Sequence, residues 1–169
     1  MLNASVFQKA YQEIAGKLTN FLVANGLPYA TACDIMQESF MRLWNMREQL
    51  TEESSLSGLV FTIARNLRTD YARRNKRMVY QDEIRDEELT TSPSDTAADD
   101  MAYLRNKLQA AINALPGDQR QAYTLFQVAG MSVRDIARQE GISESLVKVR
   151  VFRARQRLQV LLQDLKDEF

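Results

Sequence analysis

The sequence predicts an all-α protein with two small helical domains, the second of which carries a helix-turn-helix. Apolar residues recur with helical spacing along most of the 169 residues, without strand-like alternation of any length. An acidic segment rich in Ser and Thr interrupts this spacing, and residues 131–158 hold two helical patterns around Gly141. We therefore expect domains over 1–80 and 101–169, joined by a flexible acidic linker over 81–100. An acidic surface loop within one larger domain is the alternative for that segment.

Charge is unevenly distributed along the chain, although 22 basic and 22 acidic residues give a formal net charge of zero. Basic side chains dominate 65–77 and 134–157, whereas acidic side chains dominate 82–100. Because local charge sets the field that a phosphate experiences, the neutral total does not argue against nucleic-acid binding.

Several function classes are excluded by residues that the chain lacks. It has no His and a single cysteine, Cys33, so a zinc site, a His-based catalytic triad and an internal disulfide are all excluded. There is no glycine-rich phosphate loop. We expect no catalytic residues, no metal and no cofactor. No apolar run approaches the length of a membrane span and no signal segment is evident, which favours a cytoplasmic protein.

Two helices are predicted before residue 47. The first has one apolar stripe and ends before Gly26 and Pro28, which break helices. Its stripe comprises Phe7, Ala10, Tyr11, Ile14, Leu18, Phe21 and Leu22. The second is expected over about 29–46. Its predicted inward residues are Ala30, Cys33, Phe40, Leu43 and Trp44, and its predicted outward residues are Asp34, Gln37, Glu38 and Met41.

A third helix is predicted after the polar connection 47–55, with Ser54 or Ser55 as its N-cap. Its apolar face holds Leu56, Leu59, Val60, Ile63, Leu67 and Tyr71, and its other face holds Thr62, Arg65, Asn66, Thr69 and Arg73. The helix ends in a basic run, so one face offers apolar packing and the other offers positive charge.

The second domain is expected to begin with a helical stripe that Pro116 and Gly117 end, followed by a helix over about 118–129 that Gly130 closes. Ser132 is the expected cap of the first helix of the helix-turn-helix, Gly141 permits its turn, and Ser143 caps its second helix. The second helix has a buried seam of Val147, Val151, Ala154, Leu158, Leu161 and Leu165.

The outward face of that second helix indicates DNA binding. In a helix-turn-helix, the first half of the second helix reaches base edges in the major groove. Arg153 suits a bidentate contact with guanine, and Phe152 or Val149 suits a thymine methyl group. Arg150, Arg155 and Arg157 are better placed for phosphates. The alternative is a basic helix that is only solvated. The coincidence of the caps, the turn glycine and the outward Phe152 favours DNA binding over that alternative.

Three segments resemble bacterial sigma factors of the sigma-70 family, extracytoplasmic-function (ECF) class. DIMQESFMRLW (34–44) and FTIARNLRTDYARR (61–74) resemble the second conserved region of that family. The stretch from LPGDQRQ to RARQRL (115–158) resembles the fourth. The resemblance implies a promoter-specificity subunit that recruits core RNA polymerase, recognises the −10 and −35 elements and promotes DNA opening. It also implies an anti-sigma factor as a further partner, whose existence the sequence leaves open.

The resemblance also implies residue roles. It assigns polymerase binding to the helix 34–44, through Asp34, Ile35, Gln37, Glu38, Met41 and Arg42. The −10 element falls to Leu50, Ser54, Ser55, Arg65, Asn66, Arg68, Arg73 and Arg74. The −35 element falls to Lys148, Val149, Arg150, Phe152, Arg153 and Arg155.

The chain departs from the family pattern at three positions of the −10 region. The family often has Trp where Leu59 stands, Arg where Thr62 stands, and an aromatic residue at Leu50. Since Leu cannot stack on a base as an aromatic ring does, the departures leave the −10 base preference open. Two other functions are the alternatives: a free-standing helix-turn-helix regulator that binds operators without polymerase, and an interaction protein that binds an anti-sigma factor.

Overall fold

The computed structural model describes residues 2–51, 55–81 and 96–163, and the residues that it describes form helices and connections without a strand. The N-terminal half contains α1 (Ala4–Ala24), α2 (Tyr29–Asn45), the short 3₁₀ turn η1 (Arg47–Gln49) and α3 (Leu56–Gln81). The C-terminal half contains α4 (Thr96–Asn113), α5 (Gly117–Tyr123), the π-helical turn η2 (Thr124–Val128), α6 (Val133–Glu140) and α7 (Glu144–Leu161). The predicted all-α class is confirmed.

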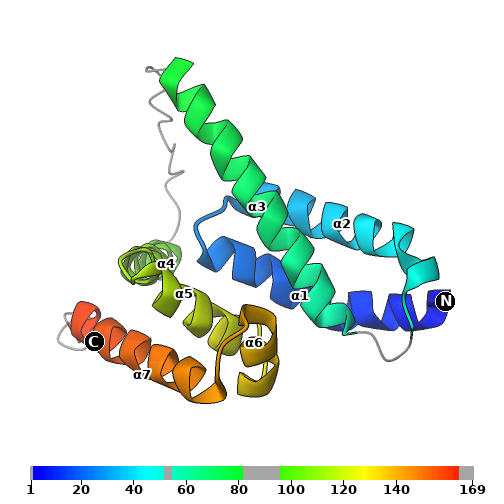
Figure 1. Ribbon diagram of the computed structural model, residues 1–169. Helices are drawn as coiled ribbons and strands as arrows, with labels where there is room; N and C mark the ends of the chain where they lie inside the picture. The colour runs from blue at the N-terminus through cyan, green and yellow to red at the C-terminus, as the bar shows by residue number, and fades with distance from the viewer. Residues whose placement is uncertain (1, 52–54, 82–95, 164–169) are drawn as a thin grey trace.

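In the N-terminal half, α1 and α2 pack side by side and α3 lies across both (Figure 1). The side chain of Asn3 caps α1 by accepting a hydrogen bond from the Val6 N–H at 2.8 Å. The chain reverses at Gly26, whose φ of +96° suits a residue without a Cβ. Apolar faces of all three helices meet in one core around Phe21 and Phe61, whose rings stack edge to face at 5.3 Å.

The predicted inward face of α2 is only partly correct. Phe40 and Leu43 are buried, whereas Ala30 is exposed and Cys33 is half-buried. The side chains of α2 that fill the core are Ala32, Ile35, Met36, Ser39, Phe40 and Leu43. The buried face is therefore rotated about one residue from the prediction, because α2 packs against both α1 and α3 rather than against one neighbour.

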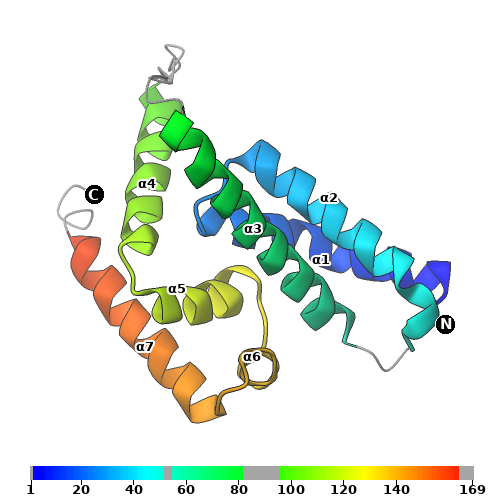
Figure 2. The same cartoon turned by 45° about the horizontal axis from the view of Figure 1, so that its top comes forward.

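In the C-terminal half, α7 packs against α5 and α6, and α4 also contacts α7 (Figure 2). The guanidinium of Arg120 donates to the carbonyl oxygens of Ile112, Asn113 and Leu115 at 2.8–3.1 Å. These carbonyls lie at the end of α4, where backbone acceptors lack helical partners. Arg120 thereby joins α4 to α5 and fixes the corner between them.

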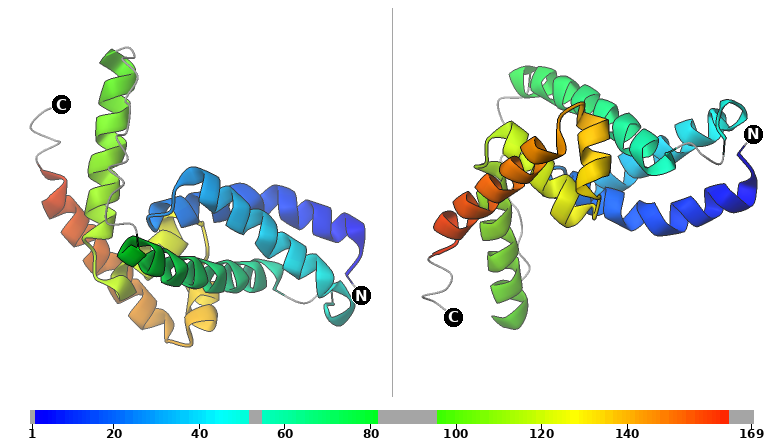
Figure 3. Two further views of the ribbon diagram at one scale, coloured as in Figure 1. Left: turned by 90° about the horizontal axis from the view of Figure 1, so that it is seen from above. Right: turned by 60° about the horizontal axis from the view of Figure 1, so that its bottom comes forward.

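The two halves pack against each other, with η2 on α1 and α6 on α3. One buried cluster contains residues of both halves, among them Phe21 and Phe61 from the first and Leu125, Met131 and Ile136 from the second. Figure 3 shows α7 on the outer side of the C-terminal half, away from α1 and α2.

Residues at both ends of the predicted linker 81–100 are helical. Its last five residues, 96–100, form the start of α4, and Gln81 ends α3. Residues 82–95 lie outside the described residues, so the flexibility of that segment stays a prediction. The sequence signal failed at 96–100 because the acidic side chains Asp99 and Asp100 suit the first turns of a helix as well as a linker.

Candidate nucleic-acid interface

The helix-turn-helix has the local geometry that its sequence predicts. The Ser132 hydroxyl accepts the Asp135 N–H and the Ser143 hydroxyl accepts the Leu146 N–H, each at 3.1 Å. Gly141, between the two helices, lies in the left-handed region with φ +67° and ψ +35°. Both caps satisfy backbone donors that a helix leaves free at its start, and the glycine ends α6 without a steric penalty.

The outer face of α7 combines positive charge with an exposed aromatic ring. Val147, Val151, Ala154 and Leu158 are buried as predicted, whereas Leu161 is 45% exposed and Leu165 lies outside the described residues. The residues that point outward near the start of the helix are Lys148, Val149, Phe152, Arg153 and Arg155, with Phe152 61% exposed. Phe152 and the exposed Val149 thus place apolar side chains in water directly beside several cations.

Two of the arginines predicted for this surface have protein partners. The Arg150 guanidinium lies 3.7 Å from the Asp118 carboxylate and is half-buried. Arg155 donates to the Gln127 amide oxygen at 3.3 Å and lies 5.5 Å from the centre of the Phe126 ring. Both side chains are thereby oriented, and Arg155 remains exposed.

The polar face of α3 begins at an N-cap. The Ser55 hydroxyl accepts the Gly58 N–H at 3.3 Å, which confirms one of the two predicted caps. Further along, Asn66, Arg73 and Arg74 are exposed, so a row of polar and basic side chains follows the helix. Thr62 is exposed as well, although its hydroxyl donates back to the Gly58 carbonyl at 2.8 Å.

Two of the predicted −10 contacts, Ser54 and Leu50, precede α3 in the chain. Ser54 lies outside the described residues. Leu50 is only 6% exposed and belongs to the N-terminal core, so it does not lie on the surface where a −10 contact was predicted. The physical reason is that η1 brings Leu50 back toward the core, where burial of an isobutyl group is favourable.

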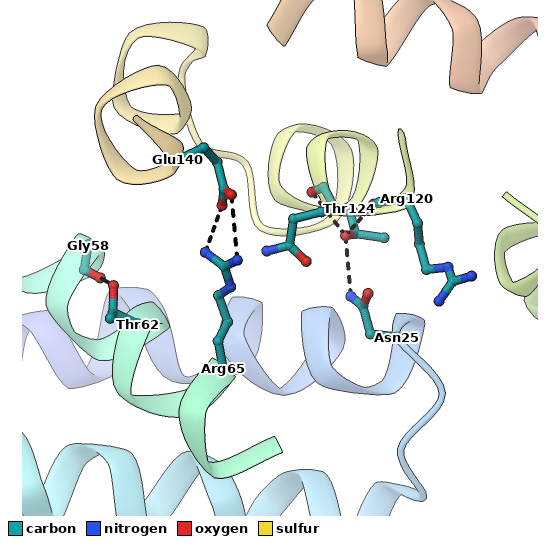
Figure 4. Close-up of polar contacts among 8 residues, drawn as sticks. Asn25, Gly58, Thr62, Arg65, Arg120, Thr124 and Glu140 are labelled. Carbon is teal, nitrogen blue, oxygen red and sulfur yellow. Dashed lines mark hydrogen bonds and ion pairs between the residues drawn. The ribbon is translucent and has the colours of Figure 1, made fainter. Parts of the chain in front are cut away.

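Arg65 and Arg68 are half-buried because the C-terminal half covers them. The Arg65 guanidinium forms an ion pair with the Glu140 carboxylate, with N–O distances of 2.7 and 3.5 Å (Figure 4). Burial lowers the pKa of Arg68, and the nearby charges of Arg65 and Arg120 lower it further. These two predicted DNA contacts therefore lie at the seam between the halves, unlike Arg73 and Arg74.

The outward face of α2 carries most of the residues predicted to bind polymerase. Asp34, Gln37, Glu38, Met41 and Arg42 are all exposed, and Met41 is 62% exposed. Glu38 and Arg42 form an ion pair at 3.1 Å, one helical turn apart. An apolar groove of about 550 Å³ runs beside them, lined by Phe7, Tyr11, Phe40, Met41 and Trp44 together with Ala4, Gln37 and Asn45.

Ile35 does not share that exposed face. It is 7% exposed and packs in the core, so its predicted place on the polymerase-binding surface was wrong. Successive residues of a helix point about 100° apart, which carries Ile35 from the exposed side of Asp34 round to the core.

Glu140 belongs to the seam between the halves, although its sequence context gives no sign of such a role. It ends α6 directly before the turn glycine, where a polar residue is unremarkable, and its partner Arg65 lies 75 residues earlier. Local patterns carry no information on such a pairing. The same holds for Asn25, whose side chain donates to the Thr124 hydroxyl at 3.2 Å (Figure 4).

Two further findings concern the part of the chain that the structure describes. None of its helices is both long and apolar enough to cross a membrane. Within the same residues, no group of three or more His, Cys, Asp or Glu side chains is placed to hold a metal ion.

Comparison with known families gives two matches. Residues 7–78 match the family described as Sigma-70 region 2, and residues 105–158 match Sigma-70, region 4. The first match spans α1 to most of α3, and the second spans the second half of α4 through α7 except its last turn. The two matches therefore include all three surfaces described above.

Individual relatives of the chain are sigma factors as well. The chain is 35% identical over 132 residues to the ECF RNA polymerase sigma factor EcfG of Rhodopseudomonas palustris, covering 78% of this chain and 71% of that one. It is 31% identical over 166 residues to the RNA polymerase sigma factor CarQ of Myxococcus xanthus, covering 96% and 92%. Among solved structures, the sigma factor RpoE in complex with the anti-sigma factor NepR from Bartonella quintana matches with a TM-score of 0.70 and 29% identity, covering 93% of this chain and 96% of that one. The chain therefore belongs to the ECF class of the sigma-70 family of RNA polymerase sigma factors.

Proposed function

We propose that this sigma factor divides its work among three surfaces: α2 binds core RNA polymerase, α3 binds the −10 element and α7 binds the −35 element. The observation that carries the proposal is the exposed, basic and partly apolar face of α7 on a helix-turn-helix with both caps in place. A subunit that acts by binding polymerase and promoter DNA does not have to catalyse a reaction. We accordingly propose that it acts in the cytoplasm without catalysing a reaction.

At the −35 element, Lys148, Val149, Phe152 and Arg153 would enter the major groove. Arg153 would donate two hydrogen bonds to a guanine, and the side chains of Val149 and Phe152 would contact thymine methyl groups. Arg155 would bind a phosphate, for which its orientation by Gln127 and Phe126 prepares it. Arg150 would do the same, after releasing or sharing the more exposed Asp118 carboxylate.

At the −10 element, α3 would hold melted DNA. Single-stranded DNA needs a basic track for its phosphates and polar groups that recognise unstacked bases. Arg73 and Arg74 supply exposed cations, and Asn66 supplies an exposed amide with both a donor and an acceptor. Arg65 and Arg68 would extend the track toward Ser55 once they are uncovered. The buried Leu50 would pack in the core rather than contact a base.

Polymerase would bind the exposed face of α2, through Asp34, Gln37, Glu38, Met41 and Arg42. The face is mixed in charge and carries one large exposed apolar side chain, Met41, which is the composition of a protein interface with an apolar centre and a polar rim. Because the solved RpoE structure is a complex with the anti-sigma factor NepR, we also propose an anti-sigma factor as a partner.

Transcription with purified core polymerase tests the proposal. The protein is added to sigma-free core enzyme with fragmented genomic DNA from its source, and the transcripts are sequenced. We expect discrete start sites that share upstream −35 and −10 elements. A folded protein that starts no transcription, yet binds specific duplex sites alone, would instead be a free-standing regulator.

A matched pair of variants separates DNA reading from folding. Arg153→Ala should reduce initiation at promoters that depend on one −35 base pair, whereas Glu144→Gln, at the start of the same helix, should leave the start sites unchanged. Equal start-site patterns for both variants would contradict the assignment of Arg153.

A further inference from the structure

The π-helical turn η2 precedes the helix-turn-helix and contacts α7 through its side chains. Its backbone has the wide hydrogen bond of a π turn, from the Ala129 N–H to the Thr124 carbonyl at 3.0 Å. The buried Thr124 hydroxyl donates to the Arg120 carbonyl at 2.7 Å and accepts from the Asn25 amide. These bonds fix the start of the turn. Because π turns within helices are frequent at functional sites, the side chains that η2 exposes are candidates for a role in binding.

Two side chains of η2 contact Arg155 of α7. The Arg155 guanidinium donates to the Gln127 amide oxygen at 3.3 Å, and its central carbon lies 5.5 Å from the centre of the Phe126 ring. Phe126 is half-buried, whereas Gln127 and Arg155 are exposed. The ring offers a cation–π platform, and the amide restricts a side chain that would otherwise have many rotamers. Arg155 is therefore held in one place at the surface.

That place is the edge of the outward face of α7. Successive residues of a helix point about 100° apart. Arg155 consequently lies between the exposed Phe152, three residues before it, and the buried Leu158, three residues after it. A helix in the major groove turns its centre toward base edges and its flanks toward the sugar–phosphate backbones. Arg155 is thus placed for a phosphate.

The partner of Arg155 is uncharged. By contrast, Arg42, Arg65 and Arg150 each lie beside a carboxylate. A carboxylate would hold the guanidinium more strongly, but it would also cancel the positive charge that attracts a phosphate. The Gln127 amide orients Arg155 and leaves its full charge available.

The other end of the same amide also offers hydrogen bonds. Because arginine only donates, Gln127 must turn its oxygen toward Arg155, which leaves the N–H groups of its amide nitrogen for other acceptors. Within the described residues these N–H groups have no acceptor. Guanidinium and amide donors therefore lie side by side on one exposed edge, and phosphate oxygens accept hydrogen bonds from both kinds of group.

We propose that Gln127 and Arg155 form a clamp for one phosphate of duplex DNA beside the −35 element, with Phe126 as its platform. The inference rests on the proposed binding of the −35 element by α7. Arg155 supplies the charge, and Gln127 positions it and donates a further hydrogen bond to the same phosphate. Since phosphate contacts carry no sequence information, the clamp sets the affinity and orientation of α7, while Arg153 reads a base.

Binding of the full chain to duplex DNA of mixed sequence measures the clamp without transcription. Fluorescence anisotropy at several KCl concentrations gives the Kd and the slope of log affinity against log salt concentration, which reports the number of phosphates neutralised. Arg155→Ala should reduce the magnitude of this slope by about one. Gln127→Ala should weaken binding about two- to tenfold with an unchanged slope, because Arg155 keeps its charge but must be ordered on binding.

Gln127→Glu distinguishes the clamp from a simple structural tie between η2 and α7. Glutamate keeps an acceptor oxygen for Arg155 but neutralises its charge, so the slope should fall by about one, as it does for Arg155→Ala. In an Arg155→Ala background, Gln127→Glu should change the slope little further, because no charge is left there to neutralise. Gln12→Glu makes the same change at an exposed position of α1 and should leave the slope unchanged.

The outcomes separate the clamp from the proposed function, provided that circular dichroism shows each variant to be folded. The clamp is overturned if Arg155→Ala leaves the slope unchanged, or if Gln127→Ala binds as tightly as the unchanged chain. It is also overturned if Gln127→Glu lowers the slope equally with and without Arg155, because the carboxylate would then only repel DNA. The expected slopes without initiation by any variant would support the clamp and overturn the proposed function.

Discussion

The turn of the helix-turn-helix gives a prediction with a magnitude set by backbone geometry. Gly141 has φ +67° and ψ +35°, and a Cβ built on it would meet no atom within 4 Å. Gly141→Ala therefore introduces strain in the backbone alone. An L-residue in the left-handed region costs about 1–2 kcal/mol, from which the reduced entropy of the unfolded chain recovers about 0.4–1 kcal/mol. We expect a net loss of about 1 kcal/mol in the free energy of unfolding.

Gly117 provides the matched control. It is the exposed first residue of α5, a Cβ there would also meet no atom within 4 Å, and its φ is not positive. Gly117→Ala should therefore stabilise the chain by about 0.4–1 kcal/mol through the unfolded state. The same chemical change is thus expected to have opposite signs at two open positions.

Urea unfolding followed by far-UV circular dichroism measures both changes, and thermal unfolding gives a second reading. For a chain of this size, 1 kcal/mol corresponds to a shift in Tm of about 2–4 °C. We expect Gly141→Ala to lower Tm and Gly117→Ala to raise it. Shifts of the same sign would refute the reasoning, because the conformation of Gly141 would then not limit the stability of the turn.

Four further predictions concern individual side chains. Arg153→Ala should weaken promoter binding by the holoenzyme by about 1–3 kcal/mol at one −35 base pair, and a gel-shift series over all base pairs should show no uniform loss. Asp34→Arg should reduce co-purification with core polymerase roughly tenfold by reversing a charge on the exposed face of α2, with an unchanged circular dichroism spectrum; normal co-purification would contradict the docking surface. Asn66→Ala, at an exposed position, should change stability by less than about 0.5 kcal/mol yet reduce permanganate-detected promoter opening, and unaltered opening would exclude a role in holding melted bases. Ser143→Ala removes the acceptor of the Leu146 N–H and should lower the free energy of unfolding by about 1 kcal/mol in the urea assay, whereas equal midpoints would mean that the cap contributes nothing.

Features that depend on a few neighbouring residues were predictable. The caps Ser55, Ser132 and Ser143 and the turn at Gly141 were expected at the positions where they occur. Each depends on backbone groups within about three residues, whose hydrogen bonds a side chain satisfies or leaves unsatisfied. The buried seam of α7 was predictable for a similar reason, since its four buried residues repeat with the helical period.

The sites that differ from the prediction are those where one element meets several others. Ile35 and Leu50 are buried because α2 and η1 each turn toward a core formed by all three N-terminal helices. The helical period says that a face exists, but the direction of that face depends on where the neighbours lie.

By itself, the sequence determined an all-helical chain with a capped helix-turn-helix, a basic second helix and the two conserved segments of a sigma factor. Only the tertiary structure decided which of the predicted DNA contacts are free: Arg73 and Arg153 are exposed, whereas Arg65 is paired with Glu140. Local backbone chemistry acts over a few residues and can be read along the chain. The pairing of charges 75 residues apart depends on how the two halves pack around one shared apolar cluster, and that is a property of the packed molecule.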